Sequence, residues 1–328
     1  MTFDMQVSVV IPVYNAAAFV REAAESALAQ PETAEVVLVE DGSPDDSLAV
    51  CETLAAEYER VHLFRHPNGE NRGAGASRNL GILNSRFEYI AFLDADDFYL
   101  PGRFSTARAV LAADPTLDGV YEAIGTHAED PVGLEKWLAR AEPDPERTTV
   151  TERIEPEHLL EALCRGEKGQ FHLDGLVVKR TVFERAGLFD EHLRLHQDTA
   201  MMYKLAGVAR LAPGSLEQPV AMRRVHAHNR ITAPRSLADV YEKRMLLFDT
   251  VWQWARRNLP PEKTRLLLEL YLRAVMLWPD HDEPPALQKA RARLLLAKRA
   301  FRAPGLLRES LYWLSFLPKA SSRMITGR

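Results

Sequence analysis

Short, mostly apolar runs alternate with helically spaced apolar positions through the first third of this chain. The runs that predict strands are 7–13 (VSVVIPV), 36–39, 61–64 and 89–93. The segments that predict helices are 19–28, 48–58 and 74–83. Continuous apolar runs are typical of strands that helices cover on both faces. The regular alternation therefore predicts an α/β fold with a doubly wound, mostly parallel sheet.

The turns between these elements carry helix-start signals. Asn15 is expected to cap the first helix, because a short polar side chain can accept from a free backbone N–H group. Ser43 to Asp46 is expected to begin the second helix, with Pro44 at its first position.

The pattern changes after Pro101. Apolar spacing predicts a helix over 104–112, one strand over 119–124 and a polar loop with little core content over 142–153. The remaining predictions are a helix near 157–165, a strand over 175–179, a short helix after Thr181, and helices over 197–207, 237–257, 262–278 and 286–302. The last third is thus predicted to be almost wholly helical.

Composition adds few surprises. The 328 residues are 46% hydrophobic and 27% charged, as is ordinary for a globular protein. No stretch approaches eighteen uninterrupted apolar residues, and the N-terminus lacks the pattern of a signal peptide. Cys51 and Cys164 form neither a disulfide framework nor a zinc motif. Together these features predict a cytoplasmic protein.

Charge is concentrated at the C-terminal end. Residues 286–328 contain ten Lys or Arg and one acid, a local net charge of +9, whereas the whole chain carries −5. Basic helices with an apolar side can lie on anionic lipid, so we expect peripheral contact with the inner face of a membrane. The alternative is a helix packed on the rest of the chain with its basic face in water. Because the remaining residues are acidic overall, a nucleic-acid partner is not expected.

The run YIAFLDADD ends a predicted strand in carboxylates. Asp94, Asp96 and Asp97 follow it with no Lys or Arg among them. Ligands of open α/β sheets bind beyond the carboxyl ends of the strands, and clustered carboxylates favour a hard divalent cation between them. The run therefore indicates a cation site, although on its own it could equally be an acidic surface turn.

A dinucleotide site is the first alternative. Residues 73–78 (GAGASR) offer G-x-G but lack the third glycine, and they follow the third predicted strand rather than the first. This pattern argues against a nicotinamide-binding protein.

Four motifs share the carboxyl edge of the predicted sheet. They are VVIPVYN, VLVEDGSPDDS, NRGAGASRNLGI and YIAFLDADD, in this order. With them the chain resembles the family 2 nucleotide-sugar glycosyltransferases of the GT-A fold, over about residues 6–230. The resemblance implies an inverting, metal-dependent sugar transferase that uses a UDP-sugar donor and a hydroxyl acceptor, either a saccharide or a lipid-linked molecule.

The resemblance also assigns the donor side. Asp41 matches the acid that reads the uracil ring, and Asp94 and Asp96 match the D-x-D acids toward ribose and toward Mn²⁺ or Mg²⁺. The other positions that it implies for nucleotide-sugar binding are Pro12, Tyr14, Asn15, Ser43, Arg78 and Ala95. Glu40 and Ser77 depart mildly from the family pattern, where Asp and Ala are usual. Without the resemblance, Arg78 would be read as a helix-surface residue.

The second half is similar to the acceptor side of the same family. Asp198 matches the general base, and Gln197 stands where the family has Glu. His226 matches a histidine near the diphosphate and metal, which makes Asp96 and His226 the implied metal ligands, and Asp174 is expected to face the acceptor. The plainer interpretations are a helix-start Asp198 and a structural His226. His281 lies between aspartates but in a Pro-rich turn, and is expected to be a solvated loop residue.

Domains follow from these boundaries. A catalytic domain is predicted over 1–235, divided into a nucleotide-sugar half (1–118) and an acceptor half (119–235), followed by a helical extension over 236–328. Two alternative functions remain at this point. One is a nucleotidyltransferase that makes a sugar nucleotide, although its Gly-rich loop would normally follow the first strand. The other is an inactive nucleotide-sugar-binding module.

Overall fold

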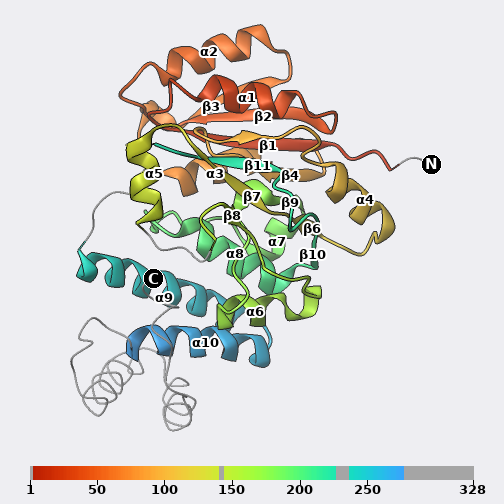
Figure 1. The fold of residues 1–328 in the computed structure, drawn as a ribbon, viewed down its shortest axis with the longest axis vertical. Helices are drawn as coiled ribbons and strands as arrows, with labels where there is room; N and C mark the ends of the chain where they lie inside the picture. Colours follow the sequence, from red (N-terminus) through yellow and green to blue (C-terminus); the bar gives the residue numbers. More distant parts are fainter. Residues whose placement is uncertain (1–2, 140–143, 227–235, 277–328) are drawn as a thin grey trace.

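A computed structural model describes residues 3–139, 144–226 and 236–276 of the chain (Figure 1). Its centre is a sheet of seven strands in the order β10-β6-β9-β4-β1-β2-β3. These strands are β1 (Val7–Val13), β2 (Thr33–Glu40), β3 (Val61–Arg65), β4 (Tyr89–Phe92), β6 (Gly119–Tyr121), β9 (Leu176–Lys179) and β10 (Leu211–Pro213). Within the sheet, only β9 runs antiparallel to its neighbours, β4 and β6. The predicted mostly parallel α/β sheet is confirmed.

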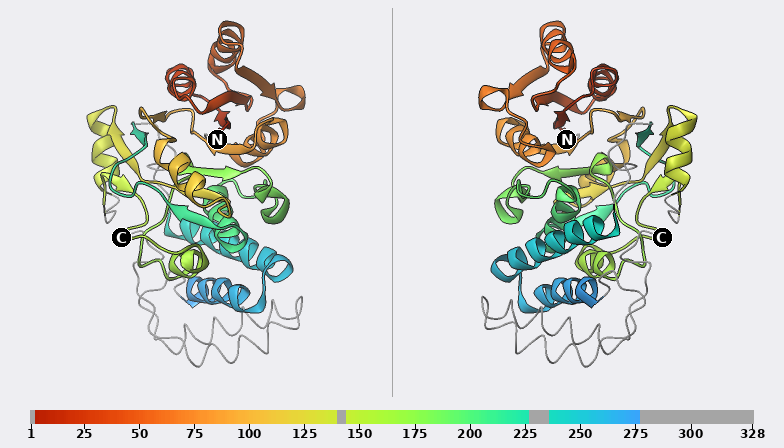
Figure 2. Two further views of the ribbon diagram at one scale, coloured as in Figure 1. Left: turned by 90° about the vertical axis from the view of Figure 1, so that its right-hand side faces the viewer. Right: turned by 90° about the vertical axis from the view of Figure 1, so that its left-hand side faces the viewer.

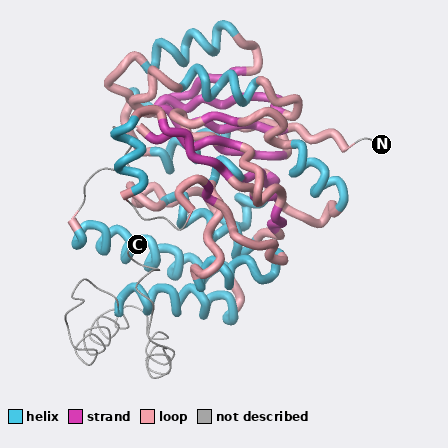
Figure 3. Tube along the Cα trace, in the orientation of Figure 1, coloured by secondary structure: helices cyan, strands magenta, loops and turns pink. Residues whose placement is uncertain are grey.

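Helices cover both faces of the sheet, as the continuous apolar strands require (Figure 3). Contacts place α1 (Val20–Leu28), α2 (Ser47–Glu57) and α4 (Ser105–Ala113) over one face. The opposite face carries α3 (Ala74–Asn84), α6 (Leu159–Arg165), α7 (Val182–Ala186) and α8 (Gln197–Val208). Along β1 the side chains alternate between the two faces of the sheet. Val9 and Ile11 belong to the core on the α1 side, and Val10 belongs to the core on the α3 side.

A smaller sheet lies beside the main one. It contains β5 (Phe98–Tyr99), β11 (Ala221–Val225), β7 (Ile124–Ala128) and β8 (Arg147–Thr148) in that order. The single strand predicted over 119–124 is therefore wrong: the chain leaves the main sheet after Tyr121 and enters the smaller sheet at Ile124. Glu122 marks this change of sheet, where its buried carboxylate pairs with Arg103 at 2.9 Å.

The segment predicted as a polar loop also contributes to the core. From Asp144 onward it includes β8, and Val150 is fully buried. The polar composition of 142–153 concealed one buried side chain that fixes the segment in place. Helix α5 (Pro131–Leu138) precedes it and packs on β7 and β11.

Two long helices follow the sheets, α9 (Leu237–Asn258) and α10 (Pro261–Met276), close to the predicted bounds. They stack on the α8 side of the main sheet, at the far end of the molecule from α2 (Figure 2). The rings of Trp252 and Tyr271 stack between them at 5.8 Å. Among the described helices, none is both long and apolar enough to cross a membrane. The predicted helix over 286–302, His281 and the basic C-terminal segment lie outside the described residues.

Candidate active site

The carboxyl ends of the parallel strands meet at one edge of the main sheet. Val10 pairs with Phe92, and Val13 pairs with Glu40, so the residues that follow β1, β2 and β4 lie side by side. Asp41 and Asp94 are thereby brought to the same edge, as the sequence predicted.

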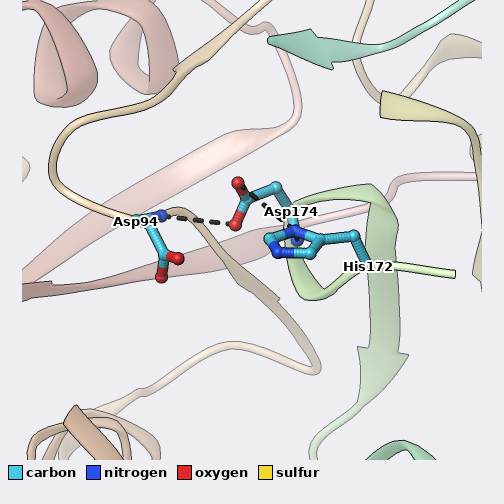
Figure 4. A group of neighbouring side chains, drawn as sticks. All are labelled: Asp94, His172 and Asp174. Carbon is cyan, nitrogen blue, oxygen red and sulfur yellow. Dashed lines mark hydrogen bonds and ion pairs between the residues drawn. The ribbon is translucent and has the colours of Figure 1, made fainter. Parts of the chain in front are cut away.

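A carboxylate cluster forms where β4 ends. Asp94, His172 and Asp174 each offer one ligand atom within 4.8 Å of the others (Figure 4). The Asp94 backbone N–H donates to Asp174 Oδ1 at 3.3 Å, and the Asp174 N–H donates to His172 Nδ1 at 3.2 Å. Asp174 lies in the short turn η3 (Leu173–Gly175), and His172 is the residue directly before that turn.

The backbone of Asp174 is bound by the buried guanidinium of Arg103. Arg103 Nε donates to the Asp174 carbonyl at 3.0 Å, and Arg103 Nη1 pairs with Glu122. The Asp174 side chain is fully buried, and its Oδ2 atom has no hydrogen-bond partner among the described residues. The acceptor contact predicted for Asp174 remains a prediction. His172 was missed, although its sequence, FHLDG, places two ionisable residues directly before a buried strand.

Burial and charge act in different directions on this cluster. Burial, together with the nearby carboxylates of Asp174 and Asp96, raises the pKa of Asp97 well above its ordinary value. Burial likewise raises the pKa of Asp174, although His172 opposes the shift. For Asp94, burial is outweighed by the guanidinium of Arg78, which holds its pKa below the ordinary value. The surroundings therefore shift the pKa values of neighbouring carboxyl groups at this edge in opposite directions.

The surroundings of His172 favour its neutral form. Burial lowers its pKa despite the neighbouring Asp174 carboxylate. A neutral imidazole can accept a hydrogen bond or ligate a metal.

Arg78 projects from α3 to the cluster. Its Nη2 atom forms an ion pair with Asp94, and its guanidinium lies 5.7 Å from the centre of the Phe189 ring. Burial opposes its charge, but Asp94 and then Asp198 raise the pKa of Arg78, so it stays protonated. Its Nε and Nη1 atoms are buried without a hydrogen-bond partner among the described residues. Such donors are rare unless a ligand uses them.

Asn79 fixes the helix that carries Arg78. Its side-chain amide donates to the Phe189 carbonyl at 3.0 Å, and its oxygen accepts from the Phe189 N–H at 2.7 Å. This pair ties α3 to the loop that precedes α8. Asn79 was not among the predicted site residues, although it lies directly after Arg78 in the matched motif.

Asp41 anchors the Gly-rich loop. Its two oxygens accept from the backbone N–H groups of Arg72, at 2.7 Å, and Gly73, at 2.8 Å. The side chain is buried, and His66 lies 3.5 Å away. Each carboxylate oxygen has a further lone pair, so the predicted uracil contact stays a prediction beside this structural role.

The turn after β1 is built differently from the prediction. Asn15 adopts a left-handed conformation with φ 53° and does not cap a helix, because α1 begins only at Val20. Its N–H donates to Ser43 Oγ at 3.2 Å. Pro12 is half-buried at the end of β1, and Tyr14 is 48% exposed, so its ring is open to solvent.

The segment after β2 does not begin α2 at Pro44. The helix starts at Ser47, and it has no side-chain cap. Polar side chains of this segment instead bind the turn after β1. Asp45 Oδ2 accepts from the Ala17 N–H at 3.0 Å, and Ser47 Oγ accepts from the Ala16 N–H at 2.9 Å. The capping prediction failed because these side chains satisfy a neighbouring loop.

Asp96 lies against β11. Its carboxylate is 3.5 Å from His226 Nε2, so the two residues predicted to ligate a metal are neighbours in space. Ala95 between the two acids is buried and belongs to the core on the α1 side. Gly133 of α5 packs directly on the His226 backbone, where an added Cβ would lie 2.6 Å from its Cα atom.

Arg224 holds the turn that carries these acids. Its backbone N–H donates to Asp97 Oδ1 at 2.7 Å, and its Nε donates to the Asp96 carbonyl at 3.0 Å. The guanidinium also pairs with Glu22 and Glu129. Arg224 was not among the predicted site residues, although it lies two residues before His226.

Gln197 and Asp198 open α8. His196 before them has φ 63°, which turns the chain into the helix. Gln197 is buried and packs on Gly75 of α3, and Asp198 Oδ1 accepts from the Thr199 N–H at 2.8 Å. Asp198 is half-buried, and its charge acts on both Arg78 and His172. The structure thus brings Asp198 to the cluster around Asp94.

Comparison with known proteins shows similarity to one family. Residues 8–150 match the model of glycosyl transferase family 2. The succinoglycan biosynthesis protein ExoU of Rhizobium meliloti is 33% identical over 193 residues, which are 58% of this chain and 54% of ExoU. An uncharacterized glycosyltransferase of Rickettsia typhi is 31% identical over 214 residues, 63% of this chain and 61% of that protein. The chain therefore spans between half and two thirds of these two relatives.

Solved structures agree on the fold. Residues 1–349 of TarS of S. aureus, in complex with UDP-GlcNAc, align with a TM-score of 0.61 at 19% identity, covering 82% of this chain and 72% of that one. The mannosyltransferase PcManGT of Pyrobaculum calidifontis, in complex with GDP-Man and Mn²⁺, aligns at 0.52 and 20% identity, covering 95% and 81%. Residues 8–150 are thus similar to glycosyl transferase family 2, and the fold is of the GT-A type, as the sequence predicted.

Proposed function

We propose that this protein moves a sugar from a UDP-sugar donor to a hydroxyl acceptor, with inversion at the transferred carbon. The observation that supports the proposal most is the convergence of Arg78, Asp94 and Asp198 at the carboxyl edge of the sheet. A buried cation with two unused donors suits an anionic nucleotide, and an acid opposite it suits proton removal.

Asp198 is the proposed general base. The acceptor oxygen attacks the anomeric carbon, the bond from that carbon to the diphosphate breaks, and UDP leaves with the electron pair. The acceptor proton passes to the Asp198 carboxylate. Gln197 beside it carries no charge, unlike the Glu that the family has at this position.

A divalent cation, Mn²⁺ or Mg²⁺, is the proposed cofactor. Carboxylate oxygens and a neutral imidazole suit such ions, and the edge offers two sets of them: Asp96 with His226, and Asp94 with His172 and Asp174. We assign the cation to Asp96 and His226, because the Asp96 side chain is 35% exposed and Asp174 is fully buried. When bound, the metal would neutralise negative charge on the leaving diphosphate.

The remaining donor contacts are assigned by position. Pro12, Tyr14, Asn15 and Ser43 form the turn beside Asp41, where we place the uridine. The polysaccharide role of ExoU supports a saccharide or lipid-linked acceptor for this chain. A nucleotidyltransferase would release pyrophosphate instead of a nucleoside diphosphate, and an inactive module would release neither.

A donor screen tests the proposal. The protein is incubated with Mn²⁺ and UDP-, GDP-, dTDP- and CMP-sugars, and both the unfolding temperature and nucleotide release are measured. Only UDP-sugars should raise the unfolding temperature, and one of them should yield free UDP. Stabilisation by GDP-sugars alone would reject the donor assignment, whereas pyrophosphate release from a nucleoside triphosphate and a sugar phosphate would reject sugar transfer.

We also propose that the chain divides into a catalytic domain over 1–235 and an extension over 236–328. Within the extension, we propose that residues 286–328 contact lipid. Co-sedimentation with vesicles that contain anionic lipid tests that contact. The full chain should bind at low salt and be released as salt rises, because the attraction is electrostatic. A full chain that stays in the supernatant at low salt would exclude the contact.

A further inference from the structure

Arg223 is a cation for which the proposed reaction has no role so far. It lies on β11, next to Arg224, but on the opposite face of the smaller sheet, since neighbouring residues of a strand point to opposite faces. Arg224 turns toward Glu22 and Glu129, whereas Arg223 lies over the Trp137 ring at 5.2 Å.

The face that carries Arg223 looks toward the carboxylate cluster. Arg223 pairs with Thr126, and on the same face Ala221 pairs with Ile124. A Cβ added to Gly175 would meet the Ile124 side chain at 3.3 Å, so this face packs against η3, the turn that holds Asp174. The charge of Arg223 acts on Asp94, His172 and Asp174 accordingly.

Arg223 makes little use of its donors. Its single hydrogen bond within the described part of the chain goes from Nη1 to Thr148 Oγ1 at 3.3 Å, and no carboxylate there lies within ion-pair distance. Three other arginines at this edge each pair with a carboxylate: Arg78, Arg103 and Arg224. A guanidinium offers five N–H groups in a planar fork that matches the oxygens of phosphate.

We infer that Arg223 binds a phosphate group of a reactant at this edge of the sheet. This inference rests on the proposed function only for the identity of the reactant. The phosphate can belong to the donor diphosphate or to a phosphate-bearing acceptor. Arg223 is then a residue that determines substrate specificity, delivered by the acceptor half of the protein.

A simpler role for Arg223 would be to balance the acids of the cluster. The two roles predict opposite results. If Arg223 only balances the acids, its removal leaves phosphate affinity unchanged and tightens the binding of Mn²⁺, because one positive charge near the cation is lost. If Arg223 binds phosphate, its removal weakens phosphate binding directly.

Calorimetric titration of the full chain with pyrophosphate in Mg²⁺ buffer tests the inference. Arg223→Gln should raise the Kd about tenfold, as expected for the loss of a charge-assisted hydrogen bond. Arg223→Lys keeps the charge without the fork and should fall between. Arg147→Gln is the matched control, because Arg147 lies on the other face of the same sheet and pairs with Asp144. Unfolding temperatures exclude variants that fail to fold.

Two further titrations identify the source of the phosphate. If the donor supplies it, Arg223→Gln weakens UDP about tenfold and leaves UMP nearly unchanged. If the acceptor supplies it, UDP affinity is unchanged and inorganic phosphate no longer binds to the UDP-saturated variant. Equal affinities of wild type and Arg223→Gln for pyrophosphate, UDP and phosphate would overturn the inference. A wild type that binds pyrophosphate through Arg223 but never UDP would reject the proposed donor instead.

Discussion

Two buried carboxylates at opposite edges of the main sheet differ in how they are compensated. Glu35, near the start of β2, accepts from Ser8 Oγ, from the Arg86 N–H and from Arg86 Nε, all at 2.7 Å. Burial alone would raise the pKa of Glu35, but these donors hold it below its ordinary value. Asp174, at the carboxyl edge, has one oxygen with no hydrogen-bond partner among the described residues, although His172 Nδ1 lies 3.5 Å from it, and burial raises the pKa of Asp174.

The difference separates structural from functional acids. A carboxylate that serves only the fold is matched by donors within the chain, since an unmatched buried charge is costly. At the carboxyl edge, Asp174 and Arg78 each keep buried polar atoms without a hydrogen-bond partner among the described residues. Both an acidic and a basic side chain are therefore incompletely hydrogen-bonded there. Such a site is completed by a ligand that brings charge of its own, as a metal nucleotide does.

The largest effect is expected for Asp198→Asn, which tests whether the carboxyl edge carries the functional acid. Asparagine keeps the shape of the side chain but cannot take a proton, so kcat should fall about 10²–10⁴-fold. UDP affinity should change less than about twofold, because the proposed base faces the acceptor. Steady-state UDP release and calorimetry measure the two quantities. Glu184→Gln, an exposed substitution on α7, is the control, and turnover by Asp198→Asn at the wild-type rate would remove Asp198 from its role.

The metal assignment is the next largest test, and two histidines make a matched pair. His226→Gln should weaken Mn²⁺ binding at least about tenfold, whereas His172→Gln should leave it nearly unchanged. Electron paramagnetic resonance of free Mn²⁺ provides the affinities. The reverse order would move the cation to Asp94, His172 and Asp174 and would make the poorly compensated Asp174 a ligand.

Arg224→Met tests whether the acid turn needs its clamp. The variant loses the bonds to the Asp96 carbonyl, Glu22 and Glu129 but keeps the backbone bond to Asp97. We expect kcat to fall about tenfold through misplacement of Asp96, with a smaller change in UDP affinity. Arg224→Lys should recover part of the rate. If Met and wild type have equal kcat values at equal stability, the turn is held by other contacts.

The smallest effect is expected at the opposite edge. Because the folded-state pKa of Glu35 is lowered, its contribution to stability is present above the unfolded-state pKa and is lost as pH falls below about 4.5. Glu35→Gln should therefore cost about 1–3 kcal/mol near neutral pH and less in acid, with activity per folded molecule unchanged. Denaturant unfolding at several pH values measures this, and an equal cost at all pH values would contradict the compensated charge.

The sequence supplied the donor half more fully than the acceptor half. Parallel strands end at one edge, so runs such as 7–13 and 89–93 were enough to bring Asp41 and Asp94 together. The turns between them were less predictable, because Ser43, Asp45 and Ser47 bond to the neighbouring β1 turn, and the N-cap residue of α2, Asp46, makes no capping bond.

In the acceptor half, the residues of the site depend on contacts that are distant in sequence. His172 reaches Asp94 only because β9 pairs antiparallel with β4, and Arg103 is buried beneath Asp174 through its pairing with Glu122. No periodicity along one chain contains that information. The difference between Arg223 and Arg224 also follows from which face of β11 each occupies.

The central claim, that the edge around Asp94 seats the nucleotide diphosphate, is tested most directly by titrating UDP in the presence of Mn²⁺. Wild type, Asp94→Asn and the exposed control Asp46→Asn are compared after their unfolding temperatures confirm folding. The account predicts that Asp94→Asn weakens UDP at least about tenfold and that Asp46→Asn binds as wild type does. UDP affinity that is equal in all three proteins would contradict it.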